Sequence, residues 1–128
     1  MTRKPFKTPH APAAIGSYSQ AVEMKGTVYV SGQIPLDPII MELVSPDFTR
    51  QAHQVFANFA AVLEEAELEW RHVAKLNVFL TDLSQFAIFN EVMSEYLDEP
   101  YPARAVVEVS GLPRGAQVEM DGIAHRVR

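Results

Sequence analysis

The chain has 128 residues, of which 48% are hydrophobic and 21% are charged, and its formal net charge is −5. These values predict a single folded domain over residues 1–128 and exclude an intrinsically disordered chain. The sequence has no cysteine, which excludes disulfides, thiolate metal sites and a cysteine nucleophile.

The charge and the apolar runs also argue against two classes of partner. Eleven basic residues are scattered among sixteen acidic ones, so we expect no phosphate-binding surface and no nucleic-acid partner. No apolar run is long enough to span a bilayer, and residues 1–10 do not read as a signal peptide. We therefore predict a cytoplasmic protein with no membrane partner.

The first predicted element is a β-hairpin. Val28, Tyr29 and Val30 form a β-branched and aromatic run typical of a strand. Residues 19–24 are its candidate partner, across a turn at Lys25 and Gly26.

A long helix follows the hairpin. Ser45, Pro46 and Asp47 are typical of a helix start, with Ser45 as the expected capping residue. Apolar residues then recur at steps of three and four, which predicts one apolar face: Phe48, Ala52, Val55, Phe56, Phe59, Val62, Leu63 and Ala66.

The second half repeats the alternation of strand and helix. Residues 73–80 read as a strand, and Asp82 or Ser84 should cap a second helix that ends before Pro100. Residues 105–109 and 117–124 read as two more strands. The apolar set of the second helix is Phe86, Phe89, Val92, Met93, Tyr96 and Leu97.

The resulting order, β-β-α-β-α-β-β, predicts an α+β fold with a single mixed sheet of about six strands. Each helix connects two strands by a crossover, so both helices should pack on one face of the sheet. The other face would be too apolar to remain exposed, and we expect a symmetric oligomer to cover it.

Two residues could carry chemistry in the C-terminal half. Arg104 begins a strand, and its guanidinium could bind a carboxylate through two hydrogen bonds or form a salt bridge at the strand end. Glu119 lies within a strand, where partial burial would raise its pKa and suit proton transfer. Asp121 shares its face, and periodicity does not separate the two carboxylates.

Tyr18 and Ser31 lie next to glycines, which let a backbone approach a ligand closely but also serve in ordinary turns. The four histidines show no spacing typical of metal ligands, and the chain has neither a serine elbow nor a glycine-rich phosphate loop. We therefore expect no metal and no cofactor.

Five stretches together resemble the Rid family of imine deaminases, also called the YjgF family, and most closely its RidA branch. They are Ala13–Ala21, Val30–Pro35, Asp82 with Phe86 and Asn90, Pro102–Arg104, and Leu112-Pro113 followed by Val118-Glu119. The resemblance covers nearly the whole chain. It implies a fold similar to that of chorismate mutase and a homotrimer with sites in the clefts between subunits.

The same resemblance implies hydrolysis of 2-imino acids to 2-keto acids and ammonia, the imines arising from enamines that pyridoxal-phosphate enzymes release. Arg104 would bind the substrate carboxylate and Glu119 would activate the attacking water. The remaining family positions, expected to line the pocket, are Tyr18 (which we also count as catalytic), Ser31, Gly32, Phe86, Asn90 and Val106.

The chain departs from the family pattern at three places. Ser17 replaces a common proline, Val106 replaces a common cysteine, and residues 37–44 lack the usual Thr-Gly turn and carry Ile39 and Ile40 instead. These changes bear on substrate range more than on fold. We expect the two isoleucines to pack against a neighbouring subunit.

Other functions remain open at this point. A trimer could hold keto acids without turnover, which would need Arg104 but not Glu119. A ribonuclease or translation inhibitor fits the acidic composition poorly, and chorismate mutase is suggested only by analogy of fold.

Overall fold

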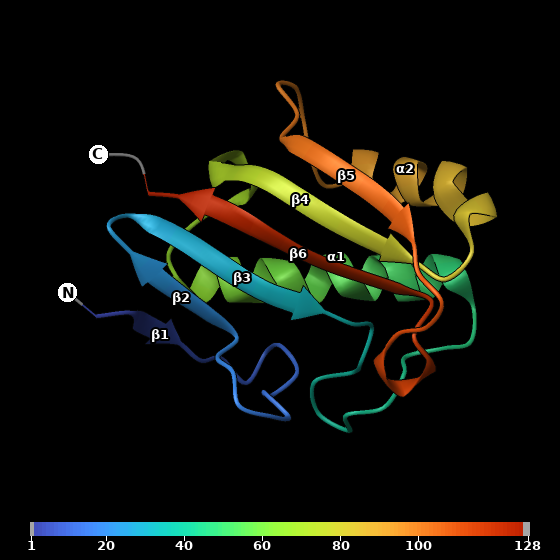
Figure 1. Cartoon of the computed structure of the whole chain (residues 1–128), viewed down its shortest axis with the longest axis horizontal. Coiled ribbons are helices and arrows are strands. Elements are labelled where there is room, and N and C mark those ends of the chain that lie inside the picture. Colours follow the sequence, from blue (N-terminus) through green and yellow to red (C-terminus); the bar gives the residue numbers. More distant parts are fainter. Residues whose placement is uncertain (1, 127–128) are drawn as a thin grey trace.

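The computed structural model describes residues 2–126, which form one mixed six-stranded sheet and two helices (Figure 1). The strand order is β1-β2-β3-β6-β4-β5, and β4 and β5 are the one parallel pair among the described strands. The predicted α+β fold is thus confirmed. The strands are β1 (Lys4–Phe6), β2 (Ala21–Met24), β3 (Thr27–Gln33), β4 (Val73–Leu80), β5 (Ala103–Glu108) and β6 (Val118–His125); the helices are α1 (Phe48–Glu65) and α2 (Phe86–Ser94).

The predicted hairpin is β2–β3. Lys25 and Gly26 both have positive φ, 51° and 83°, as a tight two-residue hairpin turn requires. The short strand β1, which pairs with β2, was not predicted. Its middle residue is Pro5, and proline is tolerated there because β1 is an edge strand.

Helix α1 spans the predicted segment, but its cap is not the expected residue. The side chain of Asp47 accepts a hydrogen bond from the Arg50 N–H, so Asp47 is the N-cap and Pro46 precedes it. The hydroxyl of Ser45, two residues earlier, accepts instead from the N–H of Asp47. The prediction of Ser45 as the cap was therefore wrong by two residues.

Helix α2 is shorter than its apolar pattern suggested. Asp82 accepts from Ser84 N–H and opens a 3-10 turn (Leu83–Gln85) that leads into the helix. The helix ends at Ser94, and Tyr96 lies in the following turn, where its ring stacks on Phe56 of α1 at 4.8 Å.

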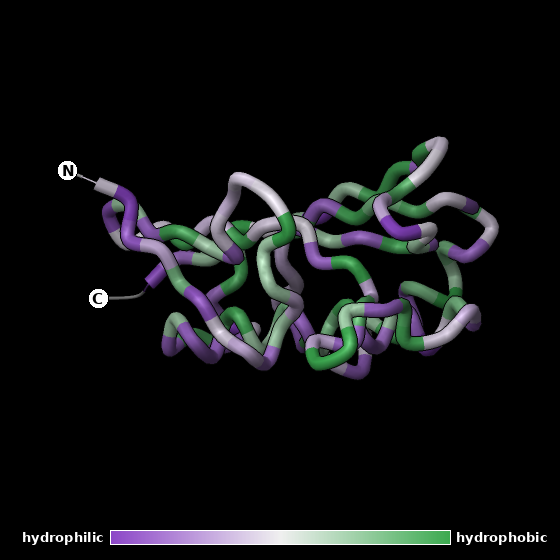
Figure 2. The backbone as a smooth tube through the Cα atoms, turned by 90° about the horizontal axis from the view of Figure 1, so that it is seen from below, coloured by the Kyte–Doolittle hydropathy of each residue, from purple (hydrophilic) through white to green (hydrophobic). Residues whose placement is uncertain are grey.

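The sheet has one covered face and one open face. Leu76, Val78 and Leu80 of β4 are buried on the covered face, together with alternate residues of β6. Asn77, Phe79 and Glu119 are half-buried and lie on the open face. Figure 2 shows the strands and the α1 layer from the side.

The described residues include no helix with both the length and the apolar character needed to cross a membrane.

Candidate functional site

Arg104 lies near the start of the edge strand β5, on the face that carries α2. Its guanidinium donates a 2.7 Å hydrogen bond to Oδ1 of Asn90 and lies 5.3 Å from the ring centroid of Phe86. It also contacts Sδ of Met93 at 3.4 Å. These side chains of α2 hold the guanidinium beside a hollow of about 410 Å³, lined by Asn90, Met93, Ser94, Tyr101, Pro102 and Arg104.

Within residues 2–126, no carboxylate lies within ion-pair distance of Arg104. The salt bridge at the strand end, which the sequence left open, does not form among these residues. The partner of Arg104 is a neutral amide, so its positive charge is not neutralised. This cation can therefore receive an anionic ligand through its free N–H groups.

Glu119 lies on the open face of β6, over Gly32 of β3. A Cβ atom at residue 32 would overlap the Glu119 carboxylate, so only glycine fits there while the carboxylate keeps this position. No donor within residues 2–126 forms a hydrogen bond with that carboxylate. Burial, and secondly the charge of Asp121, raise the pKa of Glu119 above its usual value.

The structure distinguishes Glu119 from Asp121, which the periodicity of the sequence does not. Oδ1 of Asp121 accepts a 2.8 Å hydrogen bond from the side-chain amide of Asn77 on β4. Glu119 has no such partner. Its carboxylate is therefore free to accept a proton from water, whereas one oxygen of Asp121 is already engaged.

Tyr18 and Ser31 lie near Gly32. The phenolic oxygen of Tyr18 accepts a hydrogen bond from the Ile15 N–H at 3.2 Å, and the Ser31 hydroxyl donates to the Ser19 carbonyl at 2.6 Å. Tyr18 and Gly32 both line a small cavity of about 20 Å³. Both hydroxyls thus have a structural contact and can still make a second hydrogen bond.

The predicted site residues fall into two groups. The edge group lies around α2 and β5: Phe86, Asn90, Arg104 and Val106, the last packed against the core. The face group lies on the open side of the sheet: Tyr18, Ser31, Gly32 and Glu119.

The structure does not bring the two groups together. Arg104 pairs with Leu76, and Leu76 pairs with Gly122 on β6. Glu119 lies three residues before Gly122, so the Cα atoms of Arg104 and Glu119 are roughly 14 Å apart, given ordinary strand spacings. Their side chains also point to opposite faces of the sheet.

This separation limits what one copy of the chain can do. In a 2-imino acid, the carboxylate carbon is bonded directly to the imine carbon, about 1.5 Å away. A substrate held by Arg104 therefore cannot present its imine carbon to Glu119 of the same chain.

Three residues near the site were not singled out from the sequence. Met93 was counted as core, yet its sulfur contacts Arg104. Tyr101, beside Pro102, lines the Arg104 hollow. Gln20 is buried and donates a hydrogen bond to the Pro12 carbonyl in the segment before Tyr18; its burial has no signal in the sequence.

No group of three or more His, Asp or Glu side chains suited to a metal ion occurs within residues 2–126.

Known proteins resemble this chain in both sequence and fold. A family model described as "Endoribonuclease L-PSP" matches residues 8–126. The crystal structure of RidA from the Antarctic bacterium Psychrobacter sp. superposes with a TM-score of 0.93 at 51% identity, covering 96% of this chain and 99% of that one.

Two curated relatives are similar over almost their full lengths. Protein DfrA of Myxococcus xanthus is 49% identical over 126 residues, which cover 97% of this chain and 96% of the relative. The 2-iminobutanoate/2-iminopropanoate deaminase of Mus musculus is 42% identical over 122 residues, 95% of this chain and 90% of the relative. The chain therefore belongs to the Endoribonuclease L-PSP family, which is the YjgF or Rid family.

Proposed function

We propose that the protein hydrolyses 2-imino acids to 2-keto acids and ammonia. The observation that carries this proposal is the un-neutralised guanidinium of Arg104, positioned by Asn90 and Phe86 beside a hollow that fits a small carboxylate. The deaminase name of the mouse relative supports the same reaction.

The chemistry needs few protein groups because a protonated imine is already electrophilic. Arg104 binds the substrate carboxylate and orients the imine carbon. Water adds to that carbon while Glu119 accepts its proton, and the C=N bond becomes a C–N single bond. Glu119 then gives that proton to nitrogen, the C–N bond breaks as the C=O bond forms, ammonia leaves, and the hydroxyl proton passes to the freed Glu119 carboxylate.

We further propose that the site forms between two copies of the chain, within a homotrimer as the family resemblance implies. The edge group of one copy would lie against the face group of the next, which would place Arg104 and Glu119 on the same substrate. The exposed Ile39 and Ile40, 87% and 61% accessible, give the chain an apolar surface suited to such a contact.

A mixing experiment tests the reaction and its location together. Arg104→Ala and Glu119→Gln should each lack activity in an assay where an amino-acid oxidase generates the imine and keto-acid release is followed. Co-expression of the two variants should restore about a quarter of wild-type activity, because random assembly pairs an intact arginine with an intact glutamate at that share of interfaces. Activity in the wild type but none in the mixture would contradict a site shared between two copies.

Retention of a keto acid without turnover is the second candidate, because the Arg104 hollow does not itself require Glu119. It would be favoured if the wild type bound pyruvate in calorimetry but did not accelerate imine hydrolysis. The family description also names an endoribonuclease, but the net charge of −5 gives no support for RNA binding. The absence of a nucleic-acid partner and a cytoplasmic location stay predictions.

A further inference from the structure

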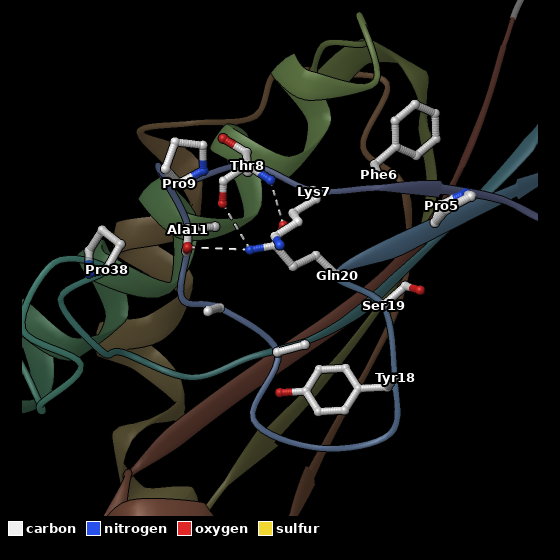
Figure 3. A pocket seen from close by; sticks show the side chains of 12 residues that line it. Pro5, Phe6, Lys7, Thr8, Pro9, Ala11, Tyr18, Ser19, Gln20 and Pro38 are labelled. Carbon is white, nitrogen blue, oxygen red and sulfur yellow. Dashed lines mark hydrogen bonds between the residues drawn. The ribbon is translucent and has the colours of Figure 1, made fainter.

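The largest hollow described in the structure touches the face group at Tyr18 and is otherwise lined by residues without a role in the proposed reaction. It has a volume of about 810 Å³ and is bounded by the N-terminal arm (residues 5–14) and the turn that carries Tyr18 (Figure 3). This volume is within the range of small-molecule sites. Its lining is mostly apolar: Pro5, Phe6, Lys7, Thr8, Pro9, Ala11, Ala13, Ala14, Tyr18, Ser19, Gln20 and Pro38.

One buried side chain fixes the wall of this hollow. Oε1 of Gln20 accepts from the Thr8 N–H at 2.7 Å, and its amide donates to the carbonyls of Thr8, Ala11 and Pro12 at 2.8–3.3 Å. Figure 3 shows the contacts of Gln20 with Thr8 and Ala11. Because these bonds hold the arm in place, the hollow is formed before any ligand arrives.

The hollow lies next to the small cavity beside Gly32, because Ala13, Tyr18 and Gln20 line both. The Glu119 carboxylate lies over Gly32. A substrate whose imine carbon faces Glu119 could therefore extend its side chain past Tyr18 into the hollow.

We propose that this hollow binds the side chain of the substrate, and that the protein therefore prefers 2-imino acids with large apolar side chains. This inference rests on the proposed function, because it assumes that the reacting carbon lies near Glu119. The single methyl group of an alanine-derived imine would leave the hollow unused. Lys7, the one charged residue in the lining, is exposed and does not oppose an apolar occupant.

Calorimetry with two keto acids of different size tests the proposal. The wild type should bind 4-methyl-2-oxopentanoate at least tenfold more tightly than pyruvate, since each added methylene in an apolar pocket contributes roughly a tenfold preference or more. Ala14→Trp should reduce this affinity ratio to near one, because Ala14 lines only the hollow. Ala57→Trp, the same change at an exposed position of α1, should keep the wild-type ratio. Ala14→Leu is a smaller second variant in case the tryptophan prevents folding, and it should lower the ratio in the same direction.

The outcomes separate this inference from the proposed function. Equal affinities in the wild type, or a ratio that survives both Ala14 substitutions, would overturn the assignment of the hollow. The oxidase-coupled assay with alanine and leucine adds the second comparison: hydrolysis of both imines with equal efficiency would overturn the inference and leave the deaminase proposal standing. Size-dependent keto-acid binding without hydrolysis of either imine would overturn the deaminase proposal and leave the assignment of the hollow standing. No binding and no hydrolysis would overturn both.

Discussion

The carboxylate of Glu119 occupies the space that a side chain at Gly32 would need. The two residues come from neighbouring strands, β6 and β3, and the lack of a side chain at residue 32 leaves room for the carboxylate on the open face. Glycine at residue 32 is thus required by the position of Glu119 and not by its own backbone conformation, since its φ is not in the left-handed region.

Gly32→Ala should therefore impair turnover while the protein still folds. The new Cβ would displace the Glu119 carboxylate, and a shift of about 1 Å in a catalytic group can lower the rate by about 10²-fold. Gly111→Ala is the matched control, because nothing lies within 4 Å of a Cβ at that position. The oxidase-coupled assay with circular dichroism checks both variants. Normal activity in Gly32→Ala would show that the position of Glu119 does not matter.

Asp121→Asn should move the acidic limb of the pH–activity profile to lower pH. The negative charge of Asp121 contributes to the raised pKa of Glu119, and activity requires ionised Glu119. Removing that charge lowers the pKa, so the base is ionised at lower pH. Asp98→Asn changes an exposed aspartate outside the site and should leave the profile unmoved. A limb that stays in place in Asp121→Asn would contradict the role of Glu119 as the base.

Glu119→Gln should stabilise the folded protein at neutral and alkaline pH. Burial raises the pKa of Glu119 in the folded state, so the folded chain favours the protonated form and loses stability as the pH rises through that pKa. The glutamine does not ionise and avoids this loss. In thermal melts at pH 8, the Tm of Glu119→Gln should be higher than the Tm of the wild type. This difference in Tm should shrink toward zero below about pH 4, near the unfolded pKa of glutamate. A Tm difference that does not change with pH would show that the glutamine stabilises the protein through its packing and not through the loss of the charge.

Arg104→Ala should weaken keto-acid binding at least tenfold, since a hydrogen bond to a charged group contributes about 1.5–3 kcal/mol. Arg71→Ala removes another arginine, one that is exposed and paired with Glu69, and should leave binding unchanged. Calorimetry with pyruvate measures both. If the two variants bind alike, Arg104 is not the carboxylate anchor.

Gln20→Ala should destabilise the protein by about 1–3 kcal/mol, because it leaves the buried Thr8 N–H without its acceptor. The N-terminal arm should also become sensitive to limited proteolysis. Gln85→Ala is the comparison, since that side chain makes no hydrogen bond within the described residues. Equal urea midpoints for the two variants would show that Gln20 does not hold the arm.

Most of the fold could be predicted because its elements have strong periodicity. The seven periodic apolar positions of α1 and the turn at Lys25 and Gly26 define their elements locally. The strand β1 could not be predicted, because three residues around Pro5 carry no period and depend on pairing with β2. The cap of α1 was misplaced because Ser45 and Asp47 are both good capping residues, and only the backbone at Asp47 decides between them.

The sequence names a set of candidate site residues but does not give their arrangement. Arg104 and Glu119 could be named from family resemblance, yet nothing local indicates that they face opposite sides of the sheet. That depends on register across β5, β4 and β6, which links residues far apart in sequence. The hydrogen bond from Asn77 to Asp121 also depends on strand register, since 44 residues separate the two in sequence.

The wide separation of Arg104 and Glu119 within one chain has a thermodynamic consequence. Sites more than about 10 Å apart with no shared partner usually contribute additively to the free energy of unfolding, so the double variant's stability should be the sum of the two single effects. Their effects on turnover would not add, because a substrate held between two copies needs both groups at once. The same pair of residues would thus be independent in folding and interdependent in catalysis.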